Sequence, residues 1–142
     1  MKKYALVWCS DKAAMDYRER MVDEFRQPDE VWEILTPADP DLVDKAAEYD
    51  GFVISGSEKS VVDDGGTPPV ARLLSFLQAV EANSDAPVLG ICFGAQALAA
   101  ALGGAVGKNP DRRFRLGVES LDWTAQAGDL PGVRHAPSCT VV

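Results

Sequence analysis

The sequence predicts an α/β fold: an open, mainly parallel, twisted sheet with helices packed on both of its faces. Short apolar runs, each long enough for one strand, alternate along the chain with segments whose apolar residues recur at helical spacing. This alternation is typical of parallel sheets, because each crossover between parallel strands is usually a helix. The first strand run is apolar throughout, which indicates burial on both faces. The length of 142 residues fits one domain, and we expect 1–142 to be a single domain.

The first strand is expected at residues 4–9, a continuous apolar run that ends in the polar pair Ser10-Asp11. This pair can cap a helix, which we expect over about residues 12–26. A second strand follows at 31–35, where apolar residues are again frequent.

A short helix is expected to begin at Asp39, because the apolar residues that follow share one face. The third strand covers 52–54. The stretch 55–69 is rich in Gly, Ser and Asp, and is expected to form a loop. From 70 to 80, leucines and valines recur at helical spacing, which predicts a strongly amphipathic helix.

The fourth strand is expected at 87–91, again as a buried run, and leads at once into an alanine-rich helix over 93–102. Gly103 and Gly104 are typical of a helix end. Beyond residue 121 turn formers are frequent, and only the last three residues suggest the start of another strand.

The composition excludes several classes of partner. A net charge of −8 argues against nucleic acid, because phosphate binding needs a basic patch. The three cysteines lie far apart without a CxxC pair, so neither a zinc site nor a disulfide framework is expected, and we expect no metal and no cofactor. No apolar stretch approaches membrane-spanning length, and no secretory signal is recognisable. We therefore expect a cytoplasmic protein without a membrane partner.

The segment Gly90-Ile91-Cys92-Phe93-Gly94 fits the strand-to-helix elbow that presents a nucleophile between two glycines, with cysteine as the nucleophile. A side chain at either glycine would collide with the neighbouring backbone. The N-terminus of the following helix favours a thiolate, and the N–H of Phe93 points where an oxyanion would form. The competing interpretation is that Cys92 is a small core residue at a tight junction.

The loop after the third strand strengthens the catalytic interpretation. Gly56 and Ser57 form a turn of small residues at the carboxyl end of a strand, and open parallel sheets bind ligands at that edge. The turn can therefore present a second backbone donor to an oxyanion. Taken alone, the same residues fit a flexible connection equally well.

Together these segments resemble the class I glutamine amidotransferases. The resemblance rests on ISGSEKSVVD followed by PVLGICFGAQALAAALGG, covers about residues 4–117, and is closest in character to stand-alone members of the γ-glutamyl peptidase type. It implies a flavodoxin-like sheet and hydrolysis of the γ-amide of glutamine or a γ-glutamyl compound. A glutamine-dependent synthetase that accepts ammonia is the partner that it implies.

The resemblance also implies roles for individual residues. Cys92 corresponds to the nucleophile that forms a γ-glutamyl thioester. The main-chain N–H groups of Gly56 and Phe93 correspond to the oxyanion donors, and Gln96 to a substrate-contacting residue, although a surface amide is the alternative for Gln96. Glu58-Lys59 stand where many relatives have proline.

The family's general base, the histidine of a His-x-Glu element, has no counterpart in this sequence. The one histidine, His135, is followed by Ala136-Pro137 and has no acid two residues on, so we expect an ordinary surface residue. We expect a domain truncated at its C-terminal end, with impaired activity or none. An open sheet edge would then favour self-association or pairing with the missing part.

Two other functions remain open. The chain can be a degenerate, non-catalytic domain that binds a partner or glutamine, as the missing His-x-Glu suggests. It can also be a hydrolase of another α/β class that uses a cysteine elbow. Gln96 and the Ser55-Gly56-Ser57 loop argue against the last alternative.

Overall fold

The computed structural model describes residues 1–114, 117–122 and 138–141. The chain divides into two compact units, Met1–Gly107 and Lys108–Val142. The expectation of a single domain stays a prediction.

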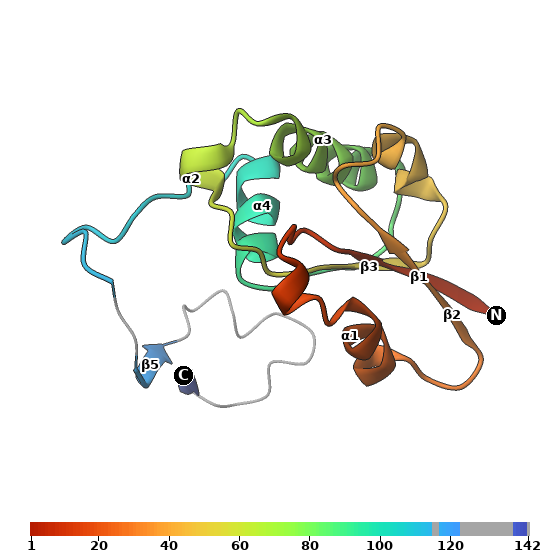
Figure 1. Cartoon of the computed structure of the whole chain (residues 1–142), viewed down its shortest axis with the longest axis horizontal. Helices are drawn as coiled ribbons and strands as arrows, with labels where there is room; N and C mark the ends of the chain where they lie inside the picture. Colours follow the sequence, from red (N-terminus) through yellow and green to blue (C-terminus); the bar gives the residue numbers. More distant parts are fainter. Residues whose placement is uncertain (115–116, 123–137, 142) are drawn as a thin grey trace. The chain divides into compact units, whose positions relative to one another are not determined.

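The first unit is built on a parallel four-stranded sheet with the strand order β2-β1-β3-β4 (Figure 1). The register aligns Lys2 with Glu30, Tyr4 with Gly51, and Phe52 with Val88. All four predicted strands are present and parallel, which confirms the predicted fold class. The strands are β1 (Lys2–Val7), β2 (Glu30–Leu35), β3 (Gly51–Ile54) and β4 (Val88–Gly90).

Helices cover both faces of this sheet, as expected. In Figure 1, α1 lies on one side of the strands, and α3 and α4 lie on the other. The larger core includes the fully buried side chains of Phe76 and Phe93, and the smaller core packs Val22 against Leu6 and Trp8. The helical segments are η1 (Ala13–Met15), α1 (Arg18–Phe25), η2 (Leu42–Ala47), α2 (Val61–Asp64), α3 (Pro68–Asn83) and α4 (Phe93–Ala101).

The single helix predicted over 12–26 is wrong, because the chain forms a 3₁₀ turn, an extended residue and then α1. The carboxylate of Asp16 accepts bonds from the guanidinium and main-chain N–H of Arg18, and such local bonds compete with a continuous helix. The expected cap at Ser10-Asp11 does not form either. The hydroxyl of Ser10 donates instead to Glu58, at 2.7 Å.

The loop predicted over 55–69 contains one short helix, α2. Ser60 begins it, because its hydroxyl accepts the N–H of Val62 while the carboxylate of Asp64 accepts the N–H of Ser60 at 2.8 Å. The reciprocal bonds satisfy main-chain donors that a helix start leaves unpaired. The alanine-rich helix ends as predicted, with Gly103 at φ 85°.

Burial of the fourth strand differs from the prediction, because β4 lies at the edge of the four-stranded sheet. Leu89 is 50% exposed there, and Leu102 of the neighbouring helix end is 54% exposed. Leu102 lines a hollow of about 300 Å³, together with Leu77, Val80 and Leu98. β4 is thus an edge strand of the sheet in the first unit, and the association of this edge with another chain stays a prediction.

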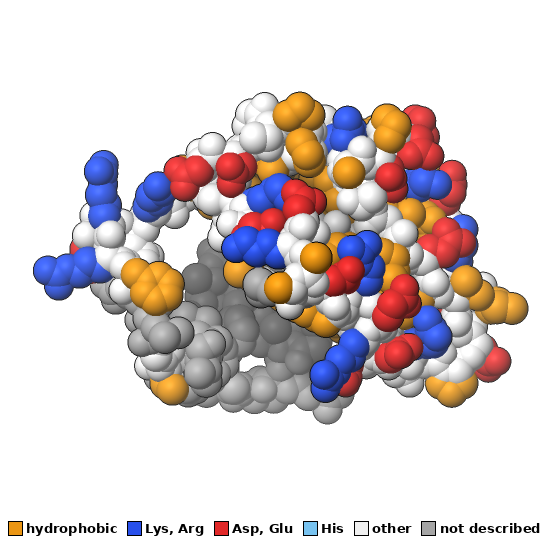
Figure 2. Space-filling model, viewed as in Figure 1, with side chains coloured by type: hydrophobic (Ala, Val, Ile, Leu, Met, Phe, Trp, Pro, Cys, Tyr) orange, Lys and Arg blue, Asp and Glu red, His pale blue; other side chains and the backbone are white. Residues whose placement is uncertain are grey.

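The second unit contains an antiparallel pair of strands, β5 (Glu119–Asp122) and β6 (Ser138–Val141), so a strand forms near the end of the chain as expected. None of the helices in the described ranges is long and apolar enough to span a bilayer. On the face of the first unit that Figure 2 presents, acidic and basic side chains are interspersed.

Candidate active site

Cys92 lies at the corner between β4 and α4, and its backbone is strained. Its φ of 53° and ψ of −107° fall outside the regions that a residue with a side chain normally adopts. Such conformations cost about 1–3 kcal/mol and persist only where the surroundings enforce them. Cys92 is also exposed, so the interpretation as a small core residue is wrong.

The two glycines of the elbow explain how this corner is enforced. A Cβ atom added at Gly90 would lie 2.6 Å from the carbonyl carbon of Gly94, and one added at Gly94 would overlap the carbonyl group of Ile54. Both positions are therefore closed to a side chain, as the sequence predicts. The close contact with Ile54 also presses the start of α4 onto the end of β3.

The Gly56 turn lies directly beside this corner. A Cβ atom added at Gly56 would lie 3.7 Å from the Cβ atom of Cys92 and 3.8 Å from the carbonyl oxygen of Ile91. The parallel pairing of β3 with β4 brings the two together, because the N–H of Ile91 donates to the carbonyl of Ile54 at 3.0 Å. The structure thus joins the two motifs that lie far apart in the sequence.

Several main-chain donors around this corner have no hydrogen-bond acceptor among the residues that the structure describes. The N–H groups of Gly56, Ser57 and Phe93 are among them. Phe93 begins α4, and its N–H belongs to the first turn, which has no acceptor within a helix. These groups are available to an anionic oxygen bound near Cys92.

Gln96 lies one helical turn after Cys92, and its N–H donates to the carbonyl of Cys92 at 3.2 Å. Gln96 therefore lies in the first turns of α4, directly after the corner. It is partly buried, and no hydrogen bond joins its amide to another described residue.

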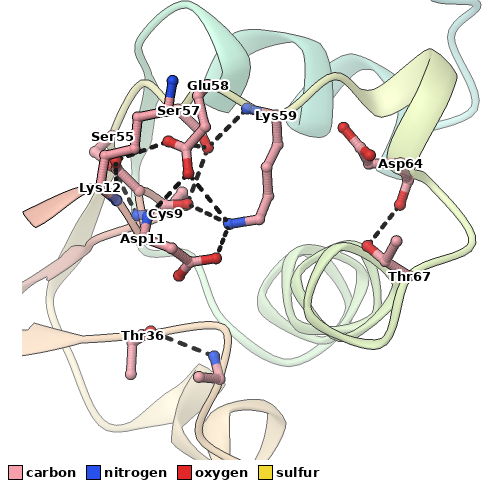
Figure 3. A network of polar contacts seen from close by, with 12 residues as sticks. Cys9, Asp11, Lys12, Thr36, Ser55, Ser57, Glu58, Lys59, Asp64 and Thr67 are labelled. Atoms are coloured by element: carbon pink, nitrogen blue, oxygen red, sulfur yellow. Dashed lines mark hydrogen bonds and ion pairs between the residues drawn. The ribbon is translucent and has the colours of Figure 1, made fainter.

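A polar network behind the Gly56 turn was missed by the sequence analysis (Figure 3). The ammonium of Lys59 binds the carboxylate of Asp11 and the carbonyl of Cys9. The Glu58 carboxylate accepts the Ser10 hydroxyl, and this hydrogen bond lowers the pKa of Glu58 to about 2. Glu58 and Lys59 thus tie the loop after β3 to the loop after β1.

The thiols of Cys9 and Cys92 differ sharply in their exposure to solvent. Burial raises the pKa of the Cys9 thiol to about 12, and this thiol lies near the carbonyl of Val7 at 3.5 Å. Cys9 is therefore protonated at neutral pH, whereas Cys92 is open to solvent. Only Cys92 of this pair is placed to act as a nucleophile.

His135 lies outside the described residues, so its surroundings stay a prediction. Within the described ranges, no cluster of three or more His, Cys, Asp or Glu side chains could hold a metal ion.

The chain matches known proteins along most of its length. The profile of the family described as Glutamine amidotransferase class-I matches residues 15–134. The chain is 33% identical over 118 residues to "Gamma-glutamyl peptidase 5" of Arabidopsis thaliana, which covers 82% of this chain and 45% of that protein. It is 29% identical over 128 residues to "Glutamine amidotransferase-like protein chry6" of Gibberella zeae, covering 85% of this chain and 52% of that protein.

A shorter match joins the chain to the "GMP synthase [glutamine-hydrolyzing]" of Vibrio vulnificus, at 38% identity over 65 residues, which covers 46% of this chain and 11% of that protein. No solved structure matches the chain. The chain spans about half the length of the first two relatives.

Proposed function

The chain belongs to the class I glutamine amidotransferase family, and on that basis we propose that Cys92 is the nucleophile that attacks the γ-carboxamide of glutamine or of a γ-glutamyl compound. The observation that carries this proposal is the strained, exposed position of Cys92 between Gly90 and Gly94. Residues held in conformations of this cost cluster at active sites and ligand-binding sites.

The proposed reaction has two steps. The sulfur of Cys92 adds to the carbonyl carbon of the γ-amide, a C–S bond forms, and the carbonyl electron pair moves onto oxygen. The oxyanion then collapses, the C–N bond breaks, and the nitrogen leaves as ammonia with the proton that the thiol gave up. Water next adds to the thioester, the C–S bond breaks, and a γ-carboxylate and the free thiol result.

The surrounding groups support defined roles in these steps. We propose that the N–H groups of the Gly56-Ser57 turn and of Phe93 stabilise the oxyanion, because they have no acceptor among the described residues and lie around Cys92. We propose that Gln96 contacts the substrate, because it lies one helical turn after Cys92 and no hydrogen bond joins its amide to another described residue.

The proton transfers need a general base, and the sequence lacks the His-x-Glu element that supplies this base in the family. The one histidine of the sequence is followed by Ala136-Pro137. We therefore propose that this chain alone hydrolyses glutamine slowly or not at all. The loss of a positioned general acid-base typically costs about 10²–10⁴ in rate.

We propose two kinds of partner for the domain. The first is a synthetase that uses the released ammonia, by analogy with the relative named as a glutamine-hydrolysing GMP synthase. The second is another polypeptide, including a second copy of this chain, at the open edge of β4 near Leu89 and Leu102. We also propose a cytoplasmic location, because the cysteine pattern of the sequence indicates a reducing compartment.

The test of this function is covalent labelling with a chloroketone analogue of glutamine, which alkylates a nucleophile that binds the γ-carbonyl region. We expect saturable labelling of Cys92, protection by free glutamine, and no labelling of Cys92→Ala. Cys9 provides the internal control, because it is buried and should stay unmodified. A folded protein in which Cys92 does not react, or reacts without protection by glutamine, would refute the proposal.

The absence of a His-x-Glu motif from the sequence favours one second candidate, a domain that binds glutamine or a partner without turnover. Calorimetric binding of glutamine without release of ammonia would support it. Ammonia release that disappears in Cys92→Ala would overturn it.

A further inference from the structure

Ser55 is the only fully buried polar residue among those the structure describes, with 0% of its surface exposed. It follows β3 directly, and its N–H donates to the carbonyl of Val7 at 3.0 Å. Its hydroxyl accepts the N–H of Cys9 at 2.9 Å and donates to the carbonyl of Gly56 at 2.9 Å. One hydroxyl therefore links the end of β1 to the turn beside Cys92.

Ser57 holds the same turn from its other side. Its hydroxyl donates to the carbonyl of Cys9 at 2.9 Å and accepts the N–H of Lys59 at 3.1 Å. The two serines that flank Gly56 thus bind both main-chain polar groups of a single residue, Cys9. That residue lies on the adjacent strand's loop, 46 and 48 positions away in the sequence.

The charged residues of the same loops reinforce this arrangement from outside (Figure 3). The Lys59 ammonium also reaches the carbonyl of Cys9, at 3.3 Å. The Glu58 carboxylate accepts the hydroxyl of Ser10 and the N–H of Asp11, at 2.7 and 3.1 Å.

We propose that Ser55 and Ser57 are positioning residues that fix the Gly56-Ser57 turn against Cys92 by binding the main chain of Cys9. This inference rests on the proposed function. Gly56 has no side chain to restrict it, so its neighbours must remove its conformational freedom. The peptide group is planar, so the bond from Ser55 to the Gly56 carbonyl also fixes the direction of the Ser57 N–H.

The size of the effect follows from the geometry that oxyanion donors require. Donors act at about 2.7–3.1 Å from the oxyanion, and loss of one costs about 10²–10³ in rate. Freeing the turn should therefore weaken an oxyanion-like adduct strongly while leaving the reactivity of the thiol itself unchanged.

The test compares two reagents on the full chain. An N-acetylated γ-aldehyde analogue of glutamine, whose blocked amine cannot condense with the aldehyde, forms a reversible thiohemiacetal: the sulfur of Cys92 bonds to the aldehyde carbon, and the aldehyde oxygen takes the electron pair and the thiol's proton. This oxygen occupies the position of the oxyanion. Iodoacetamide alkylates Cys92 by displacing iodide and needs no oxyanion donor.

The variants are Ser55→Ala and Ser57→Ala, and Ser84→Ala serves as the matched control. Ser84 also accepts a main-chain N–H, from Ala86 at 3.0 Å, but lies in the connection between α3 and β4. Ser57 is only partly buried, so its variant keeps the test valid if Ser55→Ala does not fold. Thermal melting selects the folded variants.

We expect the dissociation constant of the aldehyde adduct to rise at least about tenfold in Ser55→Ala and Ser57→Ala. The iodoacetamide rate at Cys92 should stay within about twofold of wild type, and Ser84→Ala should match wild type in both assays. Unchanged aldehyde affinity in the folded variants, with binding to wild type, would overturn this inference alone. Failure of the wild-type protein to form the adduct would overturn the proposed function and, with it, this inference.

Discussion

Replacing Gly94 by alanine tests the link between packing and chemistry at the elbow. The added Cβ atom would lie 2.9 Å from both the carbonyl carbon and the Cβ atom of Ile54, and still closer to the carbonyl oxygen. Carbon atoms pack best at about 3.5–4.0 Å, so α4 and β3 must separate by at least about 0.6 Å. Both contacts involve the backbone or a rigid branched side chain of a buried strand, so displacing these atoms costs free energy of folding.

Overpacking of this kind typically costs about 1–3 kcal/mol of the free energy of unfolding. For a chain of this length that corresponds to a fall in melting temperature on the order of 5 °C. The same displacement moves Cys92 relative to the Gly56 turn, and a misplacement of about 1 Å can cost about 100-fold in rate. We therefore expect Gly94→Ala to melt lower and to react with the chloroketone on the order of 100-fold more slowly.

Thermal unfolding followed by circular dichroism and the labelling rate at Cys92 are the two assays. Gly66→Ala is the matched control, because a Cβ atom added at Gly66 meets nothing within 4 Å. It should melt at or slightly above the wild-type temperature, as alanine restricts the unfolded chain. If Gly94→Ala instead melted and reacted like wild type, the argument that close packing enforces the strained corner would be wrong.

Three further predictions use other parts of the structure. In the folded protein at pH 8, iodoacetamide should modify Cys92 and leave Cys9 unmodified, because burial raises the pKa of the Cys9 thiol to about 12. Unfolding in urea should make the two cysteines react equally, as a peptide map would show. Because the hydrogen bond from Ser10 lowers the pKa of Glu58 from 4.5 to about 2, its stabilising contribution is complete above about pH 4.5 and is lost as the pH falls toward 2. Melting temperatures across this range should therefore converge for wild type and Glu58→Gln at low pH, and a constant difference would contradict the assignment. Leu89→Lys at the exposed edge of β4 should reduce self-association at micromolar concentration without lowering the melting temperature. If sedimentation shows that the wild-type protein is a monomer, the prediction that this edge self-associates is wrong.

The parts of the fold that depend on local pattern could be predicted from the sequence. The buried run of β1 and the glycines of the elbow each carry their signal within a few residues, so the strand and the corner at Cys92 were both predictable. The adjacency of Gly56 and Cys92 also followed, since parallel neighbours end at the same edge of a sheet.

The remaining features depend on partners that the sequence does not identify. Ser10-Asp11 has the composition of a helix cap, but its bonds go to Glu58, 47 or 48 residues away. The apolar sequence of β4 predicts burial on both faces, whereas its place at the sheet edge leaves Leu89 exposed. Neither outcome is encoded in local spacing, because each is set by which strands become neighbours.

The most direct test of the central claim uses an activated substrate, the γ-p-nitrophenyl ester of N-acetylglutamate, whose blocked amine does not expel the leaving group by cyclisation. Its leaving group departs without help from a general acid, so a correctly placed thiol suffices for the first step. We expect a burst of nitrophenolate equal to the amount of protein, followed by slow turnover, and a γ-glutamyl adduct that intact-mass and peptide analysis place on Cys92. Nitrophenolate release without a burst, an adduct on another residue, or equal reactivity with p-nitrophenyl acetate would contradict the account.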